Sequence, residues 1–290
     1  MSNATLYALT VLIWGSTWFA IEFQLGNVAP EISIVYRYVL ASAILFIYSK
    51  YKGLSLRFNL KTHFWFALLG LFLFCLNYVF ASRAQVFLTS ALAAIVFSSM
   101  LWMNIILSRV VFGTRAGHRV IFGAFLGISG IFMIFAPQVG EISFSDSILF
   151  GCLLAMLGAL SASFGNITSQ ALQQRKLPVV QANAWGMFYG AVLTLIIGLL
   201  QGHEFTFDGT FTYIASLLYL AVFGSVVAFG AYLTLLGRIG AHRAGYATVM
   251  FPVVALLLSL LFEGLTLDLT IVLGTALVLL GNLLVLKERR

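Results

Sequence analysis

The sequence predicts an all-α, polytopic membrane protein: ten transmembrane helices, arranged as a five-plus-five inverted repeat, with both termini in the cytoplasm. Three observations support this prediction. Of the 290 residues, 61% are apolar and only 9% are charged, whereas about 25% of an average soluble domain is charged. The apolar residues form ten runs that are long enough to cross a bilayer. The basic residues gather in every second connection between these runs.

The composition also excludes several classes of protein. A soluble globule of this size cannot hide so much apolar surface, so a soluble enzyme, a disordered chain and a nucleic-acid-binding domain are excluded. The expected partner is the lipid bilayer, and the net charge of +7 is interpreted as a topology signal. The two cysteines, Cys75 and Cys152, both lie in apolar runs, and no metal-ligand spacing occurs. We therefore expect no cofactor and no metal.

Each apolar run is bounded by charged residues or by Gly, Pro or Asn. A spanning helix needs about 20 residues at a rise of about 1.5 Å each. The first run ends at the Gly26-Asn27 break, and Pro30 and Pro178 open the second and seventh runs. In order, the predicted helices are 5–24, 30–49, 63–82, 86–107, 119–136, 147–171, 179–200, 210–233, 242–262 and 268–286.

The charged residues alternate between the two ends of these helices. The connections after the second, fourth, sixth and eighth helices and the C-terminal tail hold most of the basic residues, namely Lys50, Lys52, Arg57, Lys61, Arg109, Arg115, Arg119, Arg175, Lys176, Arg238, Arg243, Lys287, Arg289 and Arg290. The other connections hold Arg83 and the acidic residues Glu22, Glu31, Glu141, Asp146, Glu204, Asp208, Glu263 and Asp268. Because basic loops stay in the cytoplasm, both termini are predicted to be cytoplasmic.

A shift of about 150 residues aligns the chain with itself. Five helices per half is an odd number, so the halves, residues 1–140 and 141–290, must face in opposite directions. Inverted repeats of this kind build many secondary transporters, with the substrate site near the midplane. The matching positions are Trp14-Gly15-Ser16 with Phe164-Gly165-Asn166, Pro30 with Pro178, Met100 with Met250, and Gly123-Ala124, Leu126 and Gly130 with Gly274-Thr275, Leu277 and Gly281.

Several short motifs occur in order along the chain: W-G-S-T-W-F-A-I-E at 14–22, Y-R-Y at 36–38, G-x-x-L-x-x-x-G in the fifth and tenth helices, and F-P-V-V-A with F-E-G within 251–264. Together the motifs resemble the EamA-type drug/metabolite transporter superfamily over essentially the whole chain. The resemblance implies a five-plus-five inverted repeat and export of small metabolites, often amino acids. The chain departs from many relatives at Glu22, where they carry Lys, and at F-G-T 112–114, where they carry an acidic residue. No family role is carried over to these positions.

Arg37 and Glu22 are candidate functional charges because ionisable groups inside a membrane are costly. Arg37 lies about 10 Å into the second helix, counted from Pro30 at about 1.5 Å per residue. Its guanidinium could hold a substrate carboxylate with two hydrogen bonds. The alternatives are an internal pair with Glu22 or a side chain that snorkels to the surface. Glu22 is a candidate proton-coupling carboxylate, and its alternative is an end-of-helix charge.

Uncharged polar and aromatic residues within the runs are the other candidates for substrate binding. A cavity with aromatic walls and a few amides or hydroxyls suits a small amphipathic or aromatic metabolite. The alternative is that the hydroxyls and amides bond between helices, while Trp and Tyr mark the membrane interfaces. The candidates are Trp14, Ser16, Thr17, Trp18, Asn77, Tyr78, Ser98, Trp102, Asn166, Tyr189, Tyr232 and Tyr246.

Two further positions are candidates for gating. Pro252 lacks an N–H and leaves the Thr248 carbonyl without its helical partner, which predicts either a gating kink or a static bend. Gly230 lies in the glycine-rich stretch from Gly224 to Gly245, which predicts hinge freedom or close helix contacts.

The functional prediction is a secondary transporter that exports small metabolites, amino acids or related amphipathic compounds, by alternating access around a midplane cavity. It is expected to be a monomer or homodimer in a bacterial inner membrane. The alternatives are a channel or lipid-scramblase-like protein and an intramembrane enzyme. No P-loop occurs, and the four histidines lie in loops or at helix starts, so the sequence predicts no enzyme.

Overall fold

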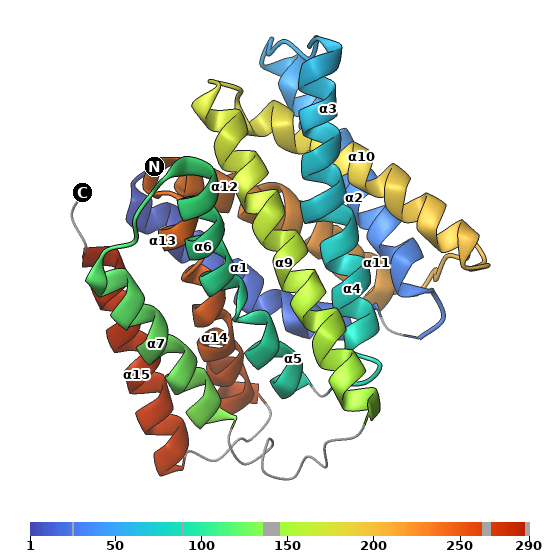
Figure 1. Ribbon diagram of the computed structural model, residues 1–290. Helices are drawn as coiled ribbons and strands as arrows, with labels where there is room; N and C mark the ends of the chain where they lie inside the picture. Colours follow the sequence, from blue (N-terminus) through green and yellow to red (C-terminus); the bar gives the residue numbers. More distant parts are fainter. Residues whose placement is uncertain (25, 89, 136–145, 263–267, 288–290) are drawn as a thin grey trace.

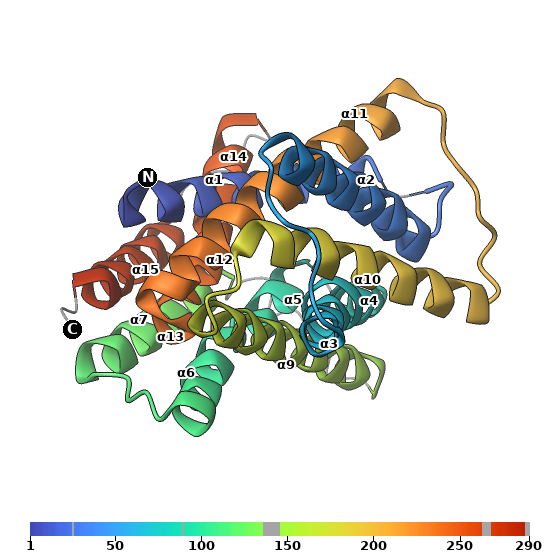
Figure 2. The ribbon, with the colours of Figure 1, turned by 90° about the horizontal axis from the view of Figure 1, so that it is seen from above.

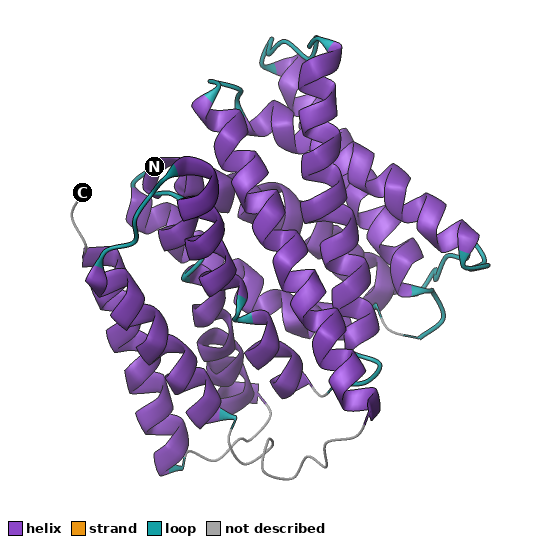
Figure 3. Cartoon of the chain, in the orientation of Figure 1, coloured by secondary structure: helices purple, strands orange, loops and turns teal. Residues whose placement is uncertain are grey.

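The computed structural model describes residues 1–24, 26–88, 90–135, 146–262 and 268–287, and every regular element in these ranges is a helix (Figure 3). The helices of the first half are α1 (Asn3–Glu22), α2 (Pro30–Tyr51), α3 (Leu60–Leu69), η1 (Gly70–Leu76), α4 (Asn77–Ala84), α5 (Ser90–Phe97), α6 (Met100–Phe112) and α7 (His118–Ile134). Those of the second half are α9 (Asp146–Gln174), α10 (Val179–Leu200), α11 (Phe211–Tyr219), η2 (Leu220–Val227), α12 (Ala228–Ile239), α13 (Ala241–Ala244), α14 (Ala247–Phe262) and α15 (Leu269–Lys287).

The chain is a multi-pass membrane protein. Within the described residues, 7 helices are long and apolar enough to cross a bilayer, and α7 is a shorter apolar helix. Large apolar side chains such as Phe122, Leu200 and Leu280 are exposed on the outside of the bundle, where lipid tails would cover them. Both termini lie at the same end of the bundle, together with the α2–α3, α6–α7 and α9–α10 connections (Figure 1).

Two helical segments are wider than an α-helix. Residues Gly70–Leu76 (η1) and Leu220–Val227 (η2) are π-helical, and each is continuous with α-helix on both sides. The sequence predicts α-helices here, because a π-turn produces no recognisable pattern in a run that is apolar on all sides. In each segment a carbonyl accepts a bond from another helix: Phe72 O from Ser161 Oγ (2.9 Å) and Gly224 O from Trp14 Nε1 (2.9 Å).

Two predicted helices are instead interrupted by tight turns. The run 86–107 breaks between α5 and α6, where Leu101 N bonds to Ser98 O at 3.1 Å. The run 242–262 breaks between α13 and α14, where Thr248 N bonds to Gly245 O at 3.1 Å. In both turns a hydroxyl donates to a backbone carbonyl three residues earlier, Ser98 to Ile95 (2.6 Å) and Thr248 to Gly245 (2.8 Å). Such side-chain bonds compete with the helical ladder.

The helices pack in pairs drawn from the two halves of the chain. α7 lies along α15 and α2 along α10 (Figures 1 and 2). α9 contacts η1, α4 and α6, while α1 contacts η2, α12 and α14. Under a shift of about 150 residues these two sets of contacts exchange. The arrangement surrounds the middle of the bundle with α1, α2, η1, α9, η2 and α12.

Glycines allow the backbones of α7 and α15 to touch. A Cβ atom on Gly130 would lie 2.5 Å from the Gly274 carbonyl oxygen, and one on Gly123 would lie 2.7 Å from the Gly281 carbonyl oxygen. Small residues that permit such close approach are a common basis of helix association in membranes. Gly230, in contrast, has nothing within 4 Å of its Cβ position.

We therefore expect opposite effects from the same substitution at two glycines. Gly130→Ala should destabilise the protein by about 1–3 kcal/mol, because overpacked contacts must separate. Gly230→Ala should leave stability unchanged or raise it by up to about 1 kcal/mol, because Ala favours helix more than Gly does. Thermal unfolding of the detergent-purified variants measures both. Equal midpoints for the two variants would contradict the close α7–α15 contact.

Candidate functional site

A cavity of about 430 Å³ lies between helices of both halves. It runs from the middle of the bundle to the end opposite the two termini, where Gln24, Pro30 and Val86 line its mouth. Its walls come from α1, α2, α4, α5, α6, α9, α12 and α14, together with the two π-helical segments. The lining residues extend inward as far as Asn166 and Tyr232 and do not reach the inner helix ends.

Arg37 is the charged residue in this lining. It is 6% exposed, and its Nε donates to Ser225 Oγ at 2.8 Å. Its Cζ lies 5.3 Å from the ring centroid of Tyr78 and 5.6 Å from that of Tyr38, within the range of cation–π attraction. No described acidic side chain pairs with it, and the Glu22 side chain lies outside what the structure describes. The partners found for the guanidinium are therefore neutral.

The π-helical segment η2 positions Ser225 beside the guanidinium. Ser225 Oγ donates to Leu220 O, five residues back, at 3.0 Å, and so presents its lone pairs to Arg37. A Cβ atom on Gly224 would lie 3.1 Å from Arg37 Nη2, so the missing side chain makes room for the guanidinium. π-turns inside helices occur frequently at functional sites, because they redirect side chains and free carbonyls.

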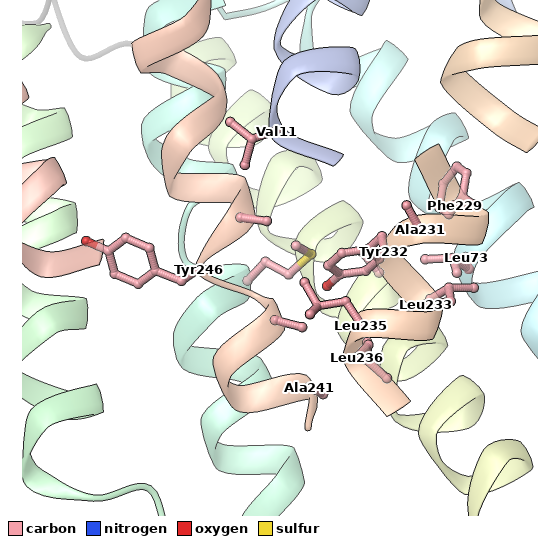
Figure 4. Close-up of a cluster of buried hydrophobic side chains, with 14 of the residues drawn as sticks. Val11, Leu73, Phe229, Ala231, Tyr232, Leu233, Leu235, Leu236, Ala241 and Tyr246 are labelled. Atoms are coloured by element: carbon pink, nitrogen blue, oxygen red, sulfur yellow. The ribbon is translucent and has the colours of Figure 1, made fainter. Parts of the chain in front are cut away.

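Aromatic rings form the wall beside Arg37. Trp14 lies at the centre of this wall, with its ring centroid 4.7 Å from Phe229, 5.0 Å from Tyr232 and 5.5 Å from Phe251. Its Nε1 donates to the Gly224 carbonyl oxygen at 2.9 Å, which fixes the indole against η2. Figure 4 shows that Tyr232 and Phe229 also belong to the buried apolar cluster.

Two amides and a hydroxyl lie deeper in the cavity. Asn77 Nδ2 donates to Leu73 O at 3.4 Å, and Asn166 Nδ2 donates to Asn104 Oδ1 at 3.3 Å. Asn77 Oδ1, Asn166 Oδ1 and the Tyr232 hydroxyl make no hydrogen bond with the described residues. These residues are 9%, 1% and 2% exposed, respectively, and their unpartnered polar atoms have almost no accessible surface, so they lie behind the atoms that line the cavity.

The structure brings seven of the predicted binding residues together in the cavity lining. They are Trp14, Thr17, Arg37, Asn77, Tyr78, Asn166 and Tyr232. The predicted residues Trp18, Glu22 and Pro252 have side chains that lie outside what the structure describes.

The remaining predicted binding residues have other contacts and do not line the cavity. Ser16 Oγ bonds with the Tyr219 hydroxyl at 2.7 Å. Ser98 Oγ donates to the Ile95 carbonyl oxygen at the turn between α5 and α6. Trp102 packs on Phe125, with ring centroids 4.8 Å apart, and the Tyr189 hydroxyl bonds with His63 Nδ1 at 3.0 Å.

Tyr246 is also outside the cavity lining. It belongs to the buried cluster, but its hydroxyl points away from the other labelled residues (Figure 4), toward α7 and α15. Its hydroxyl lies 3.2 Å from both Gly123 O and Val278 O. It therefore bonds the start of α14 to the α7–α15 pair.

Several cavity residues were missed by the sequence analysis. Ser33 lines the cavity one helical turn before Arg37, and this four-residue spacing could have indicated it. Ser225 could not be found in this way, because its contact depends on the π-turn. Phe229 and Phe251 could not be distinguished by sequence from the other phenylalanines, because the chain contains 27 of them.

Comparisons with known proteins place the chain among transporters. The model of the EamA-like transporter family matches residues 1–136 and 149–287. The chain is 28% identical to the "Uncharacterized inner membrane transporter YedA" of Escherichia coli K12, over 91% of this chain and 83% of that protein. It is 24% identical to the "Uncharacterized transporter YoaV" of Bacillus subtilis (93% and 91%) and 25% identical to a "Probable amino-acid metabolite efflux pump" of Escherichia coli K12 (88% and 84%).

A solved crystal structure has the same fold. It matches the chain with a TM-score of 0.79 at 18% sequence identity, over 98% of this chain and 96% of the other.

Two buried tyrosines offer a matched test of their roles. Tyr246→Phe should destabilise the protein by about 1 kcal/mol, because it removes a bonded hydroxyl. Tyr232→Phe should have almost no effect, because its hydroxyl has no hydrogen-bond partner among the described residues. Thermal unfolding in detergent compares them. A larger loss for Tyr232→Phe than for Tyr246→Phe would contradict these assignments.

Proposed function

The chain belongs to the EamA-like transporter family, and from this premise we propose that it is a secondary transporter that exports small metabolites, amino acids or related amphipathic compounds. The observation that carries the proposal is the central cavity, which both halves of the chain line and which contains a guanidinium without a described acidic partner. Two relatives are named as uncharacterised transporters and one as an amino-acid metabolite efflux pump. We place the protein in a bacterial inner membrane.

The chain consists, in this proposal, of two inverted repeats, residues 1–140 and 141–290, with five membrane crossings each. The family model matches the chain twice, over 1–136 and 149–287. The two π-helical segments and the two tight turns recur at a spacing of about 150 residues. The helix contacts of α9 and α1 exchange under the same shift. In each π-helical segment one carbonyl also accepts a hydrogen bond from the first helix of the opposite repeat.

The distribution of charge supports cytoplasmic termini. The α2–α3, α6–α7 and α9–α10 connections lie at the end that holds both termini (Figure 1) and, together with the helix ends that adjoin them, contain most of the described basic residues. Short basic loops remain on the cytoplasmic side. The cavity mouth at the opposite end then faces outward, and the structure corresponds to an outward-open state.

Export requires a second state in which the cavity opens to the cytoplasm. In an inverted repeat, each half can adopt the arrangement that the other half now has, and this exchange opens the cavity to the opposite side of the membrane. Ser33, three residues after Pro30, lines the outward cavity, and its repeat counterpart is Gln181, three residues after Pro178. Gln181 is 5% exposed and its Oε1 has no partner among the described residues. We expect Gln181 to line the inward cavity.

Arg37 is the proposed binding group for a substrate carboxylate. A guanidinium can donate two parallel hydrogen bonds to a carboxylate, and these bonds are strong where water is scarce. The lining stops before the inner helix ends, which favours a transporter over an open channel.

Counterflow into liposomes tests the function and the role of Arg37 together. Wild-type protein should accumulate a selective subset of a mixed pool of amino acids and related metabolites, read by mass spectrometry. Arg37→Ala should lower uptake about tenfold or more, because hydrogen bonds to charged groups contribute about 1.5–3 kcal/mol. Arg37→Lys should recover part of the activity, because lysine keeps the positive charge but cannot donate two parallel hydrogen bonds to a carboxylate.

Arg83→Ala is the control, since Arg83 is half-exposed at the rim of the bundle. Uptake that survives Arg37→Ala would remove the carboxylate role and keep the transporter. Folded wild-type protein that accumulates nothing, with and without an imposed proton gradient, would contradict the transporter proposal itself.

Cysteine accessibility tests alternating access. After replacement of Cys75 and Cys152, Ser33→Cys and Gln181→Cys should react with membrane-impermeant thiol reagents from opposite sides of the membrane. Substrate that shifts the population between the two states should change the two labelling rates in opposite directions. Rates that rise and fall together would contradict the mechanism.

A further inference from the structure

We propose that a second cleft, between α6 and α7 at the end of the bundle that holds both termini, binds an anionic phospholipid. This cleft has a volume of about 390 Å³ and is lined by Ile105, Arg109, Arg115, Ala116 and Ile121. The phosphate would lie between the two arginines, and an acyl chain would lie over the two isoleucines. The inference goes beyond the proposed transport function, and its test needs no transport.

The packing of α6 and α7 leaves room for a lipid between them. α6 packs mainly on α9 and α13, whereas α7 lies along α15 and also contacts α14 and α5. Deeper in the membrane the two helices meet, where the Trp102 and Phe125 ring centroids are 4.8 Å apart. Ile105 and Ile121 lie about one helical turn from this contact, on the side of the termini. The cleft therefore has an aromatic floor, apolar walls and a basic rim.

The cleft lies beside surfaces that face lipid. Ile106 and Val110 on α6 and Phe122 on α7 are exposed large apolar residues next to the lining positions. Lipid tails would cover such side chains in a membrane. Figure 2 shows both helices at the edge of the bundle. An acyl chain can therefore reach the two isoleucines from the surrounding bilayer.

The charge of the rim complements a phosphate. Arg109 and Arg115 are exposed, and neither forms an ion pair with an acidic side chain that the structure describes. The described acidic side chains lie near the starts of α2, α9 and α15 and in the α10–α11 connection, at the opposite end of the bundle (Figure 1). Basic pockets between membrane helices are typical binding sites for anionic lipid head groups.

Backbone bonds hold the rim in a defined conformation. α6 ends at Gly113, which is left-handed at φ 67°. Gly113 N donates to Arg109 O at 3.0 Å, and Thr114 N donates to Ser108 O at 3.2 Å, which is a common way to close a helix. As the structure describes it, α7 starts without a side-chain cap, and its first turn holds no acidic residue. The positive end of the α7 dipole therefore adds to the attraction for an anion.

A bound lipid would also connect parts of the fold. The α7–α15 pair contacts the rest of the described bundle mainly through α14 and α5. A lipid between α6 and α7 would add a contact with α6. Because a ligand that binds only the folded protein stabilises it, thermal unfolding can report the binding.

The test is thermal unfolding of the detergent-purified protein during titration with phosphatidylglycerol, or with phosphatidylcholine that carries the same acyl chains. Phosphatidylglycerol should raise the midpoint at about tenfold lower concentration than phosphatidylcholine. Inorganic phosphate at the same concentrations should give no comparable shift, because it lacks the acyl chains. Arg109→Gln combined with Arg115→Gln should remove the preference for phosphatidylglycerol. Both side chains are exposed, so this variant should fold.

Ile121→Trp tests the apolar part of the site, because it fills the cleft and keeps both arginines. It should weaken the effect of phosphatidylglycerol severalfold. The control is Arg57→Gln combined with Lys61→Gln, which removes the same charge at the same end of the bundle from exposed residues outside the cleft. This control should keep the full preference.

Four results would each overturn the inference. They are equal shifts with the two lipids, an equal shift with inorganic phosphate alone, a preference that survives loss of both cleft arginines, and a preference that the control variant loses to the same extent. The last result would mean that the basic end of the bundle attracts anionic lipid without a specific site. Counterflow of the mixed pool decides the transport function separately.

Discussion

Inside a bilayer no water is available to bond a backbone group, so every departure from the α-helix must be compensated by protein. The two π-helical segments show how this constraint shapes the molecule. Each widened turn frees carbonyls, and one carbonyl in each segment accepts a bond from a neighbouring helix, from Ser161 in one case and Trp14 in the other. These bonds hold helices from opposite halves together around the middle of the bundle.

The same constraint explains the environment of Arg37. A buried guanidinium is tolerated only when its donors have partners. The η2 segment supplies Ser225, whose own hydrogen is bonded to Leu220, and Gly224 leaves room beside the guanidinium. Two tyrosine rings add cation–π attraction. These contacts are neutral, so the arrangement holds the positive charge in place without cancelling it. A substrate that supplies negative charge therefore gains more here than it would in water.

Sequence reasoning predicted the parts of this structure that depend on apolar content and on helix ends. The all-helical, multi-pass membrane fold and the family are confirmed. Trp14, Arg37, Asn77 and Asn166 could be singled out because polar or amphipathic groups interrupt apolar runs. The π-helical segments could not be predicted. A π-turn changes the period at which side chains recur along a helix, and this period cannot be recognised in a run that is apolar on all sides. Ser98 and Tyr246 show the converse limit: their polar groups resemble site residues in sequence, but they bond to nearby backbone.

The contact between α7 and α15 has a consequence for the origin of the chain. Gly123 faces Gly281, and Gly130 faces Gly274. Under the proposed repeat, Gly123 corresponds to Gly274 and Gly130 to Gly281. Gly123 therefore meets the counterpart of Gly130, and Gly130 meets the counterpart of Gly123. This is the pattern of an isologous interface, in which one surface is complementary to itself. A single five-helix unit therefore carries both sides of the contact. Two separate copies inserted in opposite orientations could assemble through it, and fusion of two such genes would preserve an interface that already existed.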